Sequence, residues 1–522
     1  MVMTPKIQHP SRRGVLGMAG GTAALLGLGL PMRALAQAAE TGRITVAYPT
    51  DVPTWDPNAR SLAPVQSLYK CVFDQPLTQA PDLTLQPALI TDWQFSDDGL
   101  ALDVTLRNDV KFHDGSQMTA DDFRYTFFER PGAEVADGQR KLDTSFLWRK
   151  VSDIEISSPT QARMVFSEPM PSAVTWLHFL CSFVVPKAYM EDVGAEAFAA
   201  KPIGTGPYKL VSYEQASRLE LEAFADHWAG APAIGKVTID IVRDPTARVA
   251  AIESRRADAA IDVPIREAER LGQIDGLTAT IEPTTDIMLL QLTASGGFEN
   301  PKIRQAAHRA IDKDAINQAF FLGNAVPIDA PAARGTPGYP DDLEFGFDLE
   351  IATALLAEAG HGPENPVAIT FYTTNGVFPN DFEMARAIAG MWKKIGINAT
   401  VEAVEASTYQ ERLRAGTLPE ATMYQWGNTT GDPELYAGYL LDPNSIFSAF
   451  KSDELGAMIS PLLVEMDTEK RQAGYRAVNK TAVENGDAIG LLQAVKTVVH
   501  IDALEVQSYV NGWILPQTWT MG

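Results

Sequence analysis

The sequence predicts a mixed α/β fold, and a strand–helix–strand unit in its second half is the clearest sign. An apolar strand is expected at 368–372, apolar residues recur at helical spacing from Met384 to Ile395, and alternation resumes over 397–403. Gly396 separates the helix from the second strand. The length of 522 residues allows three or four domains, or fewer large lobes.

The first half of the chain contributes strands and turns. A short strand at 44–48 precedes a loop at 49–57 that is rich in proline and polar residues. Alternating apolar residues on both sides of the turn at 97–99 predict a hairpin that ends at Leu106. Thr119 resembles an N-cap that opens the next helix.

The later elements begin with recognisable signals. A strand is expected at 237–241, followed by a helix at 246–256. Asn300 and Pro301 predict the start of another helix, and a further helix is expected from 349 to 359. No internal repeat and no long flexible linker divides the sequence, so its domains are expected to share strands.

The N-terminus predicts export. Arg12 and Arg13 form a twin-arginine pattern, an apolar, glycine-rich run extends to Leu30, and small residues precede an expected cleavage after Ala36. Residues 1–36 are therefore interpreted as a twin-arginine signal peptide, and the mature protein is expected in the periplasm. The run is marginal in length and hydrophobicity for a membrane-spanning helix.

The charge balance argues against nucleic acid as a partner. The chain has 43 Lys and Arg against 66 Asp and Glu, a net charge of −23. Such a charge repels a phosphate backbone or an anionic membrane surface.

Motifs for catalysis, cofactors and metals are missing from the sequence. The seven histidines never occur at spacings of three or four, and no phosphate-binding loop or serine elbow is found. The only cysteines, Cys71 and Cys181, lie among apolar residues, which favours buried thiols and leaves a disulfide open. The predictions are therefore no enzyme, no cofactor and no metal. A periplasmic enzyme stays an alternative, because the twin-arginine route often exports folded proteins with cofactors.

A ligand-binding loop is expected where a strand ends at 423–433. An apolar start leads into a polar, glycine-containing turn, and ligand sites are often built from such loops. The alternative is a strand followed by a structured turn without a ligand.

Several stretches together resemble one protein family. The most specific stretch contains Leu85-Gln86-Pro87-Ala88-Leu89, Val110-Lys111-Phe112-His113-Asp114-Gly115 and Thr119-Ala120-Asp121-Asp122, and weaker matches extend over the mature chain. This pattern is similar to the bacterial extracellular solute-binding protein family 5, the peptide-, dipeptide- and nickel-binding components of ATP-binding-cassette (ABC) importers. Arg255 departs from it, since the family usually has glycine there.

The resemblance implies a two-lobed type II periplasmic-binding-protein-like α/β fold with an extra inserted domain and two hinge strands joining the lobes. The first lobe would comprise 43–75, 205–285 and 498–522, the inserted domain 76–204, and the second lobe 286–497. The implied function is the capture of a small molecule between the lobes and its delivery by a monomer to a pair of ABC permeases. A ligand sensor or a chaperone with the same fold is an alternative.

The resemblance also bears on the ligand. Thr429 occupies the position where dipeptide binders carry an aspartate for the ligand's ammonium group, and Asn375 aligns with their carboxylate-binding arginine. A hydroxyl cannot replace a carboxylate as the partner of a desolvated charge. A modified peptide, a glycosidic or opine-like conjugate or an aromatic amide is therefore expected, although the neighbouring residues also resemble the glutathione-binding branch.

The predicted ligand-binding residues come from three segments. Trp426 is expected to stack on the ligand, so Trp426→Ala should weaken binding with little effect on the stability of the empty protein. A packed core tryptophan is the alternative. The full set is Asp51, Trp55, Asn375, Phe378, Gln425, Trp426, Asn428 and Thr429.

Overall fold

A large mixed sheet provides the framework of the chain. The computed structural model describes residues 42–522 except 136, 139 and 344. The strand order is β15-β14-β16-β12-β17-β11-β1-β10-β9-β8, and β13 pairs with β17. The bounds are β1 Gly42–Tyr48, β8 Tyr208–Glu214, β9 Arg218–Ala223, β10 Ile234–Ile241, β11 Ala259–Ile261, β12 Leu277–Leu292, β13 Val326–Pro327, β14 Val367–Thr373, β15 Ile397–Ala403, β16 Ala421–Trp426 and β17 Ala488–Ile501.

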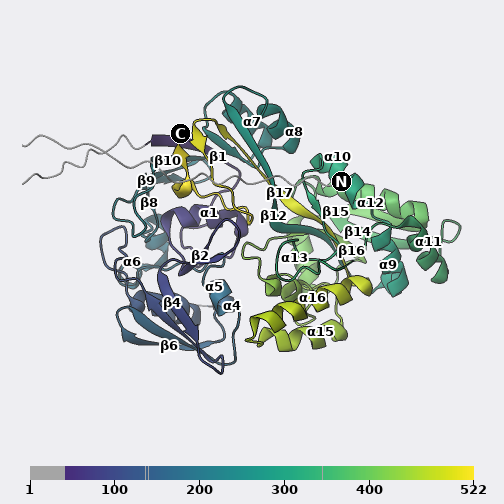
Figure 1. Cartoon of the computed structure of the whole chain (residues 1–522), viewed down its shortest axis with the longest axis horizontal. Coiled ribbons are helices and arrows are strands. Elements are labelled where there is room, and N and C mark those ends of the chain that lie inside the picture. Colours follow the sequence, from purple (N-terminus) through teal and green to yellow (C-terminus); the bar gives the residue numbers. More distant parts are fainter. Residues whose placement is uncertain (1–41, 136, 139, 344) are drawn as a thin grey trace, which may run out of the picture. The chain divides into compact units, whose positions relative to one another are not determined.

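The long strands β12 and β17 connect two groups of strands. They run antiparallel and lie side by side (Figure 1). β11 pairs with the C-terminal part of β17, and β16 pairs with the C-terminal part of β12. We call β1 and β8–β11 the first strand group, and β14–β16 the second. The ladder between β12 and β17 breaks between Pro283 and Ile287, so residues 284–286 have no partner in it. This break lies where the two groups meet, and residues 284–286 there do not follow the alternating side-chain pattern of a regular strand.

A separate antiparallel sheet is inserted in the sequence between β1 and β8. Its order is β4-β5-β7-β6, and the predicted hairpin is confirmed as β4 and β5. The bounds are β4 Ile90–Phe95, β5 Ala101–Leu106, β6 Val151–Ser158 and β7 Gln161–Phe166. Two small pairs complete the strands: β2 Leu77–Gln79 with β3 Leu85–Pro87, and β18 Leu504–Glu505 with β19 Thr520–Met521.

Most predicted helix starts are confirmed by their caps. The Asn300 side chain accepts from the amide of Lys302 at the start of α9, and Thr119 and Asp122 form a capping box on α2. The α-helices are α1 Ala63–Val72, α2 Ala120–Arg124, α3 Arg130–Gly132, α4 Thr144–Leu147, α5 Ala173–Trp176, α6 Lys187–Ala200, α7 Pro245–Glu253, α8 Ile265–Leu271, α9 Pro301–Arg309, α10 Lys313–Phe321, α11 Leu349–Glu358, α12 Asp381–Ile395, α13 Ala406–Ala415, α14 Ala437–Leu440, α15 Asp453–Ile459 and α16 Thr468–Glu484. The π-helix η1 Tyr125–Glu129 and the 3₁₀ turns η2 Gly296–Phe298, η3 Pro433–Leu435, η4 Ser460–Leu463 and η5 Pro516–Thr518 complete the elements.

One predicted helix end is wrong. The helix expected to reach Arg256 ends at Glu253, because Arg255 has a φ of 58° and leaves the right-handed helix. Glycine adopts this left-handed conformation without steric cost, which explains why glycine suits this position. The Arg255 guanidinium donates to the carbonyls of Gly276 and Asp275, and these bonds offset part of the strain.

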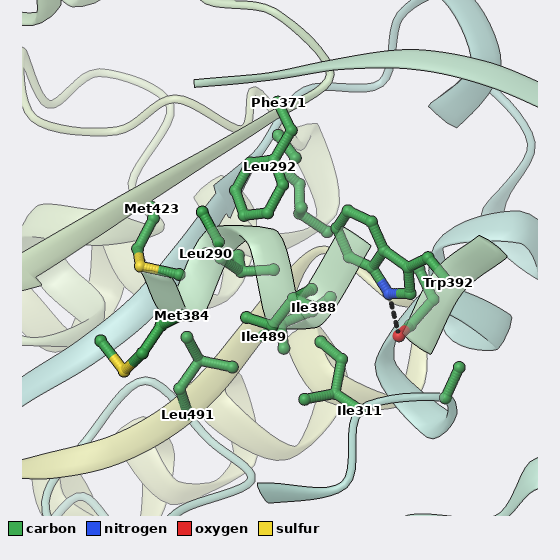
Figure 2. Close-up of a cluster of buried hydrophobic side chains, with 14 of the residues drawn as sticks. Leu290, Leu292, Ile311, Phe371, Met384, Ile388, Trp392, Met423, Ile489 and Leu491 are labelled. Carbon is green, nitrogen blue, oxygen red and sulfur yellow. Dashed lines mark hydrogen bonds between the residues drawn. The ribbon is translucent and has the colours of Figure 1, made fainter. Parts of the chain in front are cut away.

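The strand–helix–strand prediction is confirmed by β14, α12 and β15. The two strands are parallel, and α12 packs an apolar face onto the core of the second group (Figure 2). Trp392 is fully buried there, and its indole nitrogen donates to the carbonyl of Ala307 over 2.8 Å. Phe371 and Leu290 belong to the same core, so this helix fixes the sheet that leads to the candidate site.

Both cysteines are buried and free, as the favoured interpretation predicts. Cys71 packs in the core around β1, whereas Cys181 belongs to the core of the inserted sheet. Burial raises the pKa of each thiol to about 12.

The predicted signal peptide at 1–36 lies outside the described residues. Among residues 42–522, apart from the three omitted, no helix is long and apolar enough to cross a membrane. The predicted lobe and domain boundaries stay predictions.

Candidate functional site

The polar turn between β16 and η3, residues 427–432, is organised by Asn428. This side chain is fully buried, and its Oδ1 accepts from the amides of Thr430 and Gly431 at 3.2 and 3.0 Å. Its Nδ2 donates to the carbonyl of Asp432 over 2.9 Å. Asn428 therefore has a structural role in the turn, with little hydrogen-bonding capacity left for a ligand.

Residues far away in sequence hold this turn. Gln79 donates from Nε2 to the carbonyl of Thr430 over 2.8 Å, and Asn511 donates from Nδ2 to the carbonyl of Thr429 over 3.0 Å. Thr175 donates its hydroxyl to Asp432 over 2.8 Å. The turn follows β16 of the second strand group, whereas Gln79 and Thr175 come from the stretch between β1 and β8. The turn therefore bridges separate parts of the fold.

A buried ion pair fixes the far end of the turn. Arg471 on α16 donates to Asp432 over 2.9 Å and to Glu434 over 2.8 Å. Burial favours the neutral form of Asp432, but the Arg471 charge outweighs it and lowers the pKa of this carboxyl. The turn is thus anchored on both sides.

Asp286 lies in the break of β12, beside the turn. Its Oδ1 accepts from the backbone amide of Asn428 over 3.1 Å. Burial raises the pKa of Asp286 to about 6, opposed by the Lys496 charge and by hydrogen bonding from Asn428 and Gln425. Lys496 itself pairs with Asp262 at 2.9 Å. The site thus contains a carboxylate whose environment penalises its charge.

Three buried polar atoms near the break have no hydrogen-bond partner among the described residues. They are the hydroxyl oxygens of Thr285 and Thr429 and the Oε1 of Gln425. An unpaired polar atom in a buried position costs free energy comparable to a lost hydrogen bond. A bound molecule that supplied these hydrogen bonds would remove this cost.

Trp426 has features of both roles considered from the sequence, a ligand contact and a packed core tryptophan. It is half-buried, and its indole nitrogen donates to the carbonyl of Leu435 over 2.5 Å. Its ring lies 5.4 Å from Phe447 and 6.3 Å from Tyr439, and both of these rings are also half-buried. Trp426 is thus part of a partly exposed aromatic cluster that includes structural contacts.

The opening loop uses its predicted residues for internal contacts. Asp51 accepts from the hydroxyl of Tyr213 over 2.9 Å and from the amide of Ala216 over 2.7 Å. Trp55 is only 2% exposed and packs edge-on against Tyr69 and Tyr213. The described contacts of both residues hold the loop on the first strand group.

Asn375 and Phe378 lie together in the loop between β14 and α12. Asn375 is exposed, whereas Phe378 is 8% exposed and belongs to the second group's core. Asp381 organises this loop, since its carboxylate accepts from the hydroxyl of Thr374 and the amide of Gly376 at 2.7 and 2.8 Å. The structure brings Gln425, Trp426, Asn428 and Thr429 into one strand and turn, whereas the other four predicted residues lie in two separate loops, at 49–57 and 374–380.

Sequence analysis missed Gln79, Asp286 and Asn511. Asp286 is a charged residue directly before the apolar run 287–290, and that contrast could have singled it out. Gln79 and Asn511 carried no such signal, because their positions depend on long-range contacts. Within the part of the chain that the structure describes, no three or more His, Cys, Asp or Glu side chains are grouped so that they could hold a metal ion.

The chain is similar in sequence to proteins of known function. The chain is 26% identical over 430 residues to heme-binding protein A of Haemophilus influenzae, covering 75% of this chain and 76% of that protein. It is 27% identical over 383 residues to di/tripeptide-binding protein 2 of Pseudomonas aeruginosa, covering 70% and 72%.

A solved structure shares the fold. The dipeptide-binding protein of a Pseudoalteromonas species, in complex with Met-Leu, superposes with a TM-score of 0.78 at 21% identity, over 92% of this chain and all of that chain. The predicted two-lobed α/β fold is thereby confirmed. The family profile matches residues 84–448, and the chain belongs to the bacterial extracellular solute-binding proteins, family 5.

Proposed function

We propose that this protein captures a peptide-like or conjugated small molecule between its two lobes and delivers it to an ABC-type permease pair in the inner membrane. One observation carries the proposal: the bridging turn at 427–432 is held by Gln79, Thr175 and Asn511, while buried polar atoms next to it have no partner. The turn lies where separate parts of the fold meet, and a ligand bound there could form hydrogen bonds with the unpaired atoms. Family membership supports the same function.

The mechanism is a change of population between open and closed forms. A ligand that contacts both lobes favours the closed form, and the closed form presents it to the permease. The ligand must bind the closed form more tightly than the open one, because equal affinity would shift nothing. No covalent bond changes in this cycle, so we propose a binding protein and not an enzyme.

The domain organisation and location are parts of the proposal. The lobes would follow the boundaries predicted from the sequence, with β12 and β17 as the two hinge strands. The chain would be exported by its twin-arginine signal, cleaved near Ala36, and act as a monomer in the periplasm. The extracellular character of the family supports export.

The ligand class is proposed from the relatives and the residues together. A di/tripeptide-binding relative supports a peptide-like solute. The half-buried aromatic cluster around Trp426 supports a ligand with an apolar or aromatic group. Thr429, in place of an aspartate, and Asn375, in place of an arginine, would disfavour recognition of a free dipeptide at those two positions.

The test is thermal unfolding of the mature protein with di- and tripeptides, glutathione, opines, oligosaccharides and nickel. A ligand at a hundredfold excess over its dissociation constant stabilises the folded state by about 2.7 kcal/mol. Stabilisation by a peptide or conjugate supports the proposal. No stabilisation by any of these solutes, together with turnover or a bound cofactor in the purified protein, would favour the alternative of an exported enzyme.

A further inference from the structure

The break in β12 collects a small set of charged groups that the fold does not balance internally. We call Asp262, Asp286 and Lys496 the hinge cluster. Asp286 occupies the unpaired segment 284–286 of β12, Lys496 lies on the neighbouring strand β17, and Asp262 follows β11. All three side chains are half-buried, so water screens their charges only partly.

Lys496 serves mainly Asp262. Its Nζ lies 2.9 Å from one oxygen of Asp262 and 3.2 Å from the other. Two carboxylates therefore share one lysine, and the hinge cluster carries one excess negative charge when Asp286 is ionised. Among the described residues, Lys496 is the cation whose charge lowers the pKa of Asp286. Two tyrosines also interact with the hinge cluster, Tyr436 with Asp286 and Tyr48 with Lys496 and Asp262, and burial raises the pKa of both, so both are neutral.

The hydrogen-bond acceptors around Asp286 are also incompletely used. The Asn428 amide donates to Oδ1, the Gln425 side chain also interacts with the carboxyl and lowers its pKa, and no hydrogen bond to Oδ2 is found among the described residues. The Oε1 of Gln425, which lies on β16 opposite Met288 of β12, and the hydroxyl of Thr429, which follows Asn428 in the turn, are buried without partners among the described residues, and Thr429 is only 5% exposed. A group that brings several donors and a positive charge would satisfy this set.

A primary ammonium group has these properties. It carries one positive charge and three donors, and it accepts nothing. A neutral amide or hydroxyl could use the free acceptors but would leave the excess charge uncompensated in a half-buried place. The hinge cluster thus discriminates between a cationic ligand and a neutral one of the same shape.

We propose that Asp286 is the counter-ion for a primary ammonium group of the ligand, with Gln425 and Thr429 as additional acceptors. This inference rests on the proposed function and makes it more specific: the solute carries a free amine. Thr429 in place of an aspartate then no longer argues against a ligand with a free ammonium group. The negative charge that the turn lacks would be supplied by Asp286 of β12, beside the turn.

The position of Asp286 links the ligand to the hinge. Its carboxylate lies on one connecting strand and accepts from the Asn428 amide, so a cation bound to Asp286 lies where β12 meets the bridging turn. Because Asp286 and the turn both fall in the predicted second lobe, such a ligand favours the closed form only if its other groups contact the first lobe.

Protons compete with the ligand for this carboxylate. The ammonium group requires the ionised form of Asp286, whose pKa is raised to about 6 by burial. Affinity should therefore be highest above this pH and fall as the pH decreases through it, by up to about tenfold per pH unit below it. Lys496 stays charged in this range, because its pKa is raised by Asp262 despite its burial.

The test compares Met-Leu with N-acetyl-Met-Leu, which has the same side chains but no cation, by calorimetric titration at pH 7.5 and pH 5. The variants are D286N, which keeps the shape and removes the charge, and the matched control D103N, which removes an exposed charge paired with Arg163. Phenethylammonium is used as a cation without a peptide. Circular dichroism verifies that both variants are folded.

The expected result is binding of Met-Leu that acetylation and D286N each weaken by about tenfold or more, with no change in D103N. D286N should also remove the difference between the two pH values. Equal binding of the free and acetylated peptides, or unchanged affinity in folded D286N, would overturn the role of Asp286 and leave the proposed function intact. Binding of phenethylammonium that D286N abolishes, without binding of either peptide, would keep the cation site and overturn the peptide-like ligand. Binding of neither Met-Leu nor phenethylammonium would overturn the role of Asp286, whereas the proposed function would then be decided by the thermal screen with the other solutes.

Discussion

Asn511 donates its side-chain amide to the backbone carbonyl of Thr429 over 3.0 Å, although the two residues are 82 positions apart in sequence. The same nitrogen also donates to the Oε1 of Gln79 over 3.2 Å. Both amides are almost completely buried. This small network ties the C-terminal segment to the turn that contains the unpaired groups.

Asn511→Ala is expected to weaken ligand binding by about five- to tenfold, because the Thr429 carbonyl loses a buried donor and the turn is no longer held in place by Asn511. The affinity is measured by calorimetric titration with a solute identified in the thermal screen. Asn365→Ala is the matched control, since Asn365 also donates its Nδ2 to a backbone carbonyl, that of Gly360, but in an exposed local turn. A similar loss of affinity in both variants would contradict a specific role of Asn511.

Trp426→Ala is expected to destabilise the empty protein by about 2–4 kcal/mol, because the change removes buried ring contacts and the bond to the Leu435 carbonyl. The sequence alone predicts weaker binding with little loss of stability, and the contacts of the ring now argue against the second part. Urea unfolding of the variant without ligand measures the change. Unfolding at the wild-type midpoint would restore the interpretation of Trp426 as purely a ligand contact.

Arg471→Met is expected to destabilise the protein by about 3–5 kcal/mol, because Asp432 and Glu434 would remain buried without a cation. Arg163→Met is the matched control, since its ion pair with Asp103 is exposed and should contribute at most about 1 kcal/mol. Denaturant unfolding near pH 7 measures both variants. A comparable small effect in each would mean that the buried pair is dispensable.

D286N is expected to stabilise the empty protein at pH 7.5, and this advantage should disappear as the pH falls below about 6. The sign follows from the raised pKa: between the unfolded and folded pKa values the folded state binds more protons, so its stability falls as the pH rises through this interval. Above pH 6 the wild type therefore bears the cost of a charged Asp286, which the amide avoids. Thermal unfolding over pH 4.5–8 measures the difference, and a constant difference across this range would show that Asp286 has an ordinary pKa.

The two thiols are expected to be unreactive toward a thiol reagent in the folded protein and fully reactive in concentrated guanidinium chloride. Burial removes access to them and raises the pKa of Cys71 and Cys181 to about 12, so little thiolate is present at neutral pH. Titration with a chromogenic disulfide measures the number of free thiols. No free thiol in the unfolded protein would mean that the purified chain carries the disulfide.

The sequence by itself determined the local elements and the fold class. Helix starts such as Asn300-Pro301 and the parallel unit of β14, α12 and β15 depend on nearby residues, so periodicity and capping predicted them. The end of α7 was missed because Arg255 takes a left-handed conformation that a residue other than glycine seldom adopts. The family pattern added the two-lobed arrangement, which the solved relatives confirm.

Only the tertiary structure decided which partners the individual site residues have. Asn428 and Asp51 stay predicted ligand contacts, but the Asn428 side chain accepts from an amide of its own turn, and Asp51 accepts from the amide of Ala216 between β8 and β9. Asp286 and Asn511 were not predicted, since their importance comes from partners far away in sequence. Burial, charge balance and the partners of each polar atom are set by long-range packing, which the order of residues along the chain does not reveal.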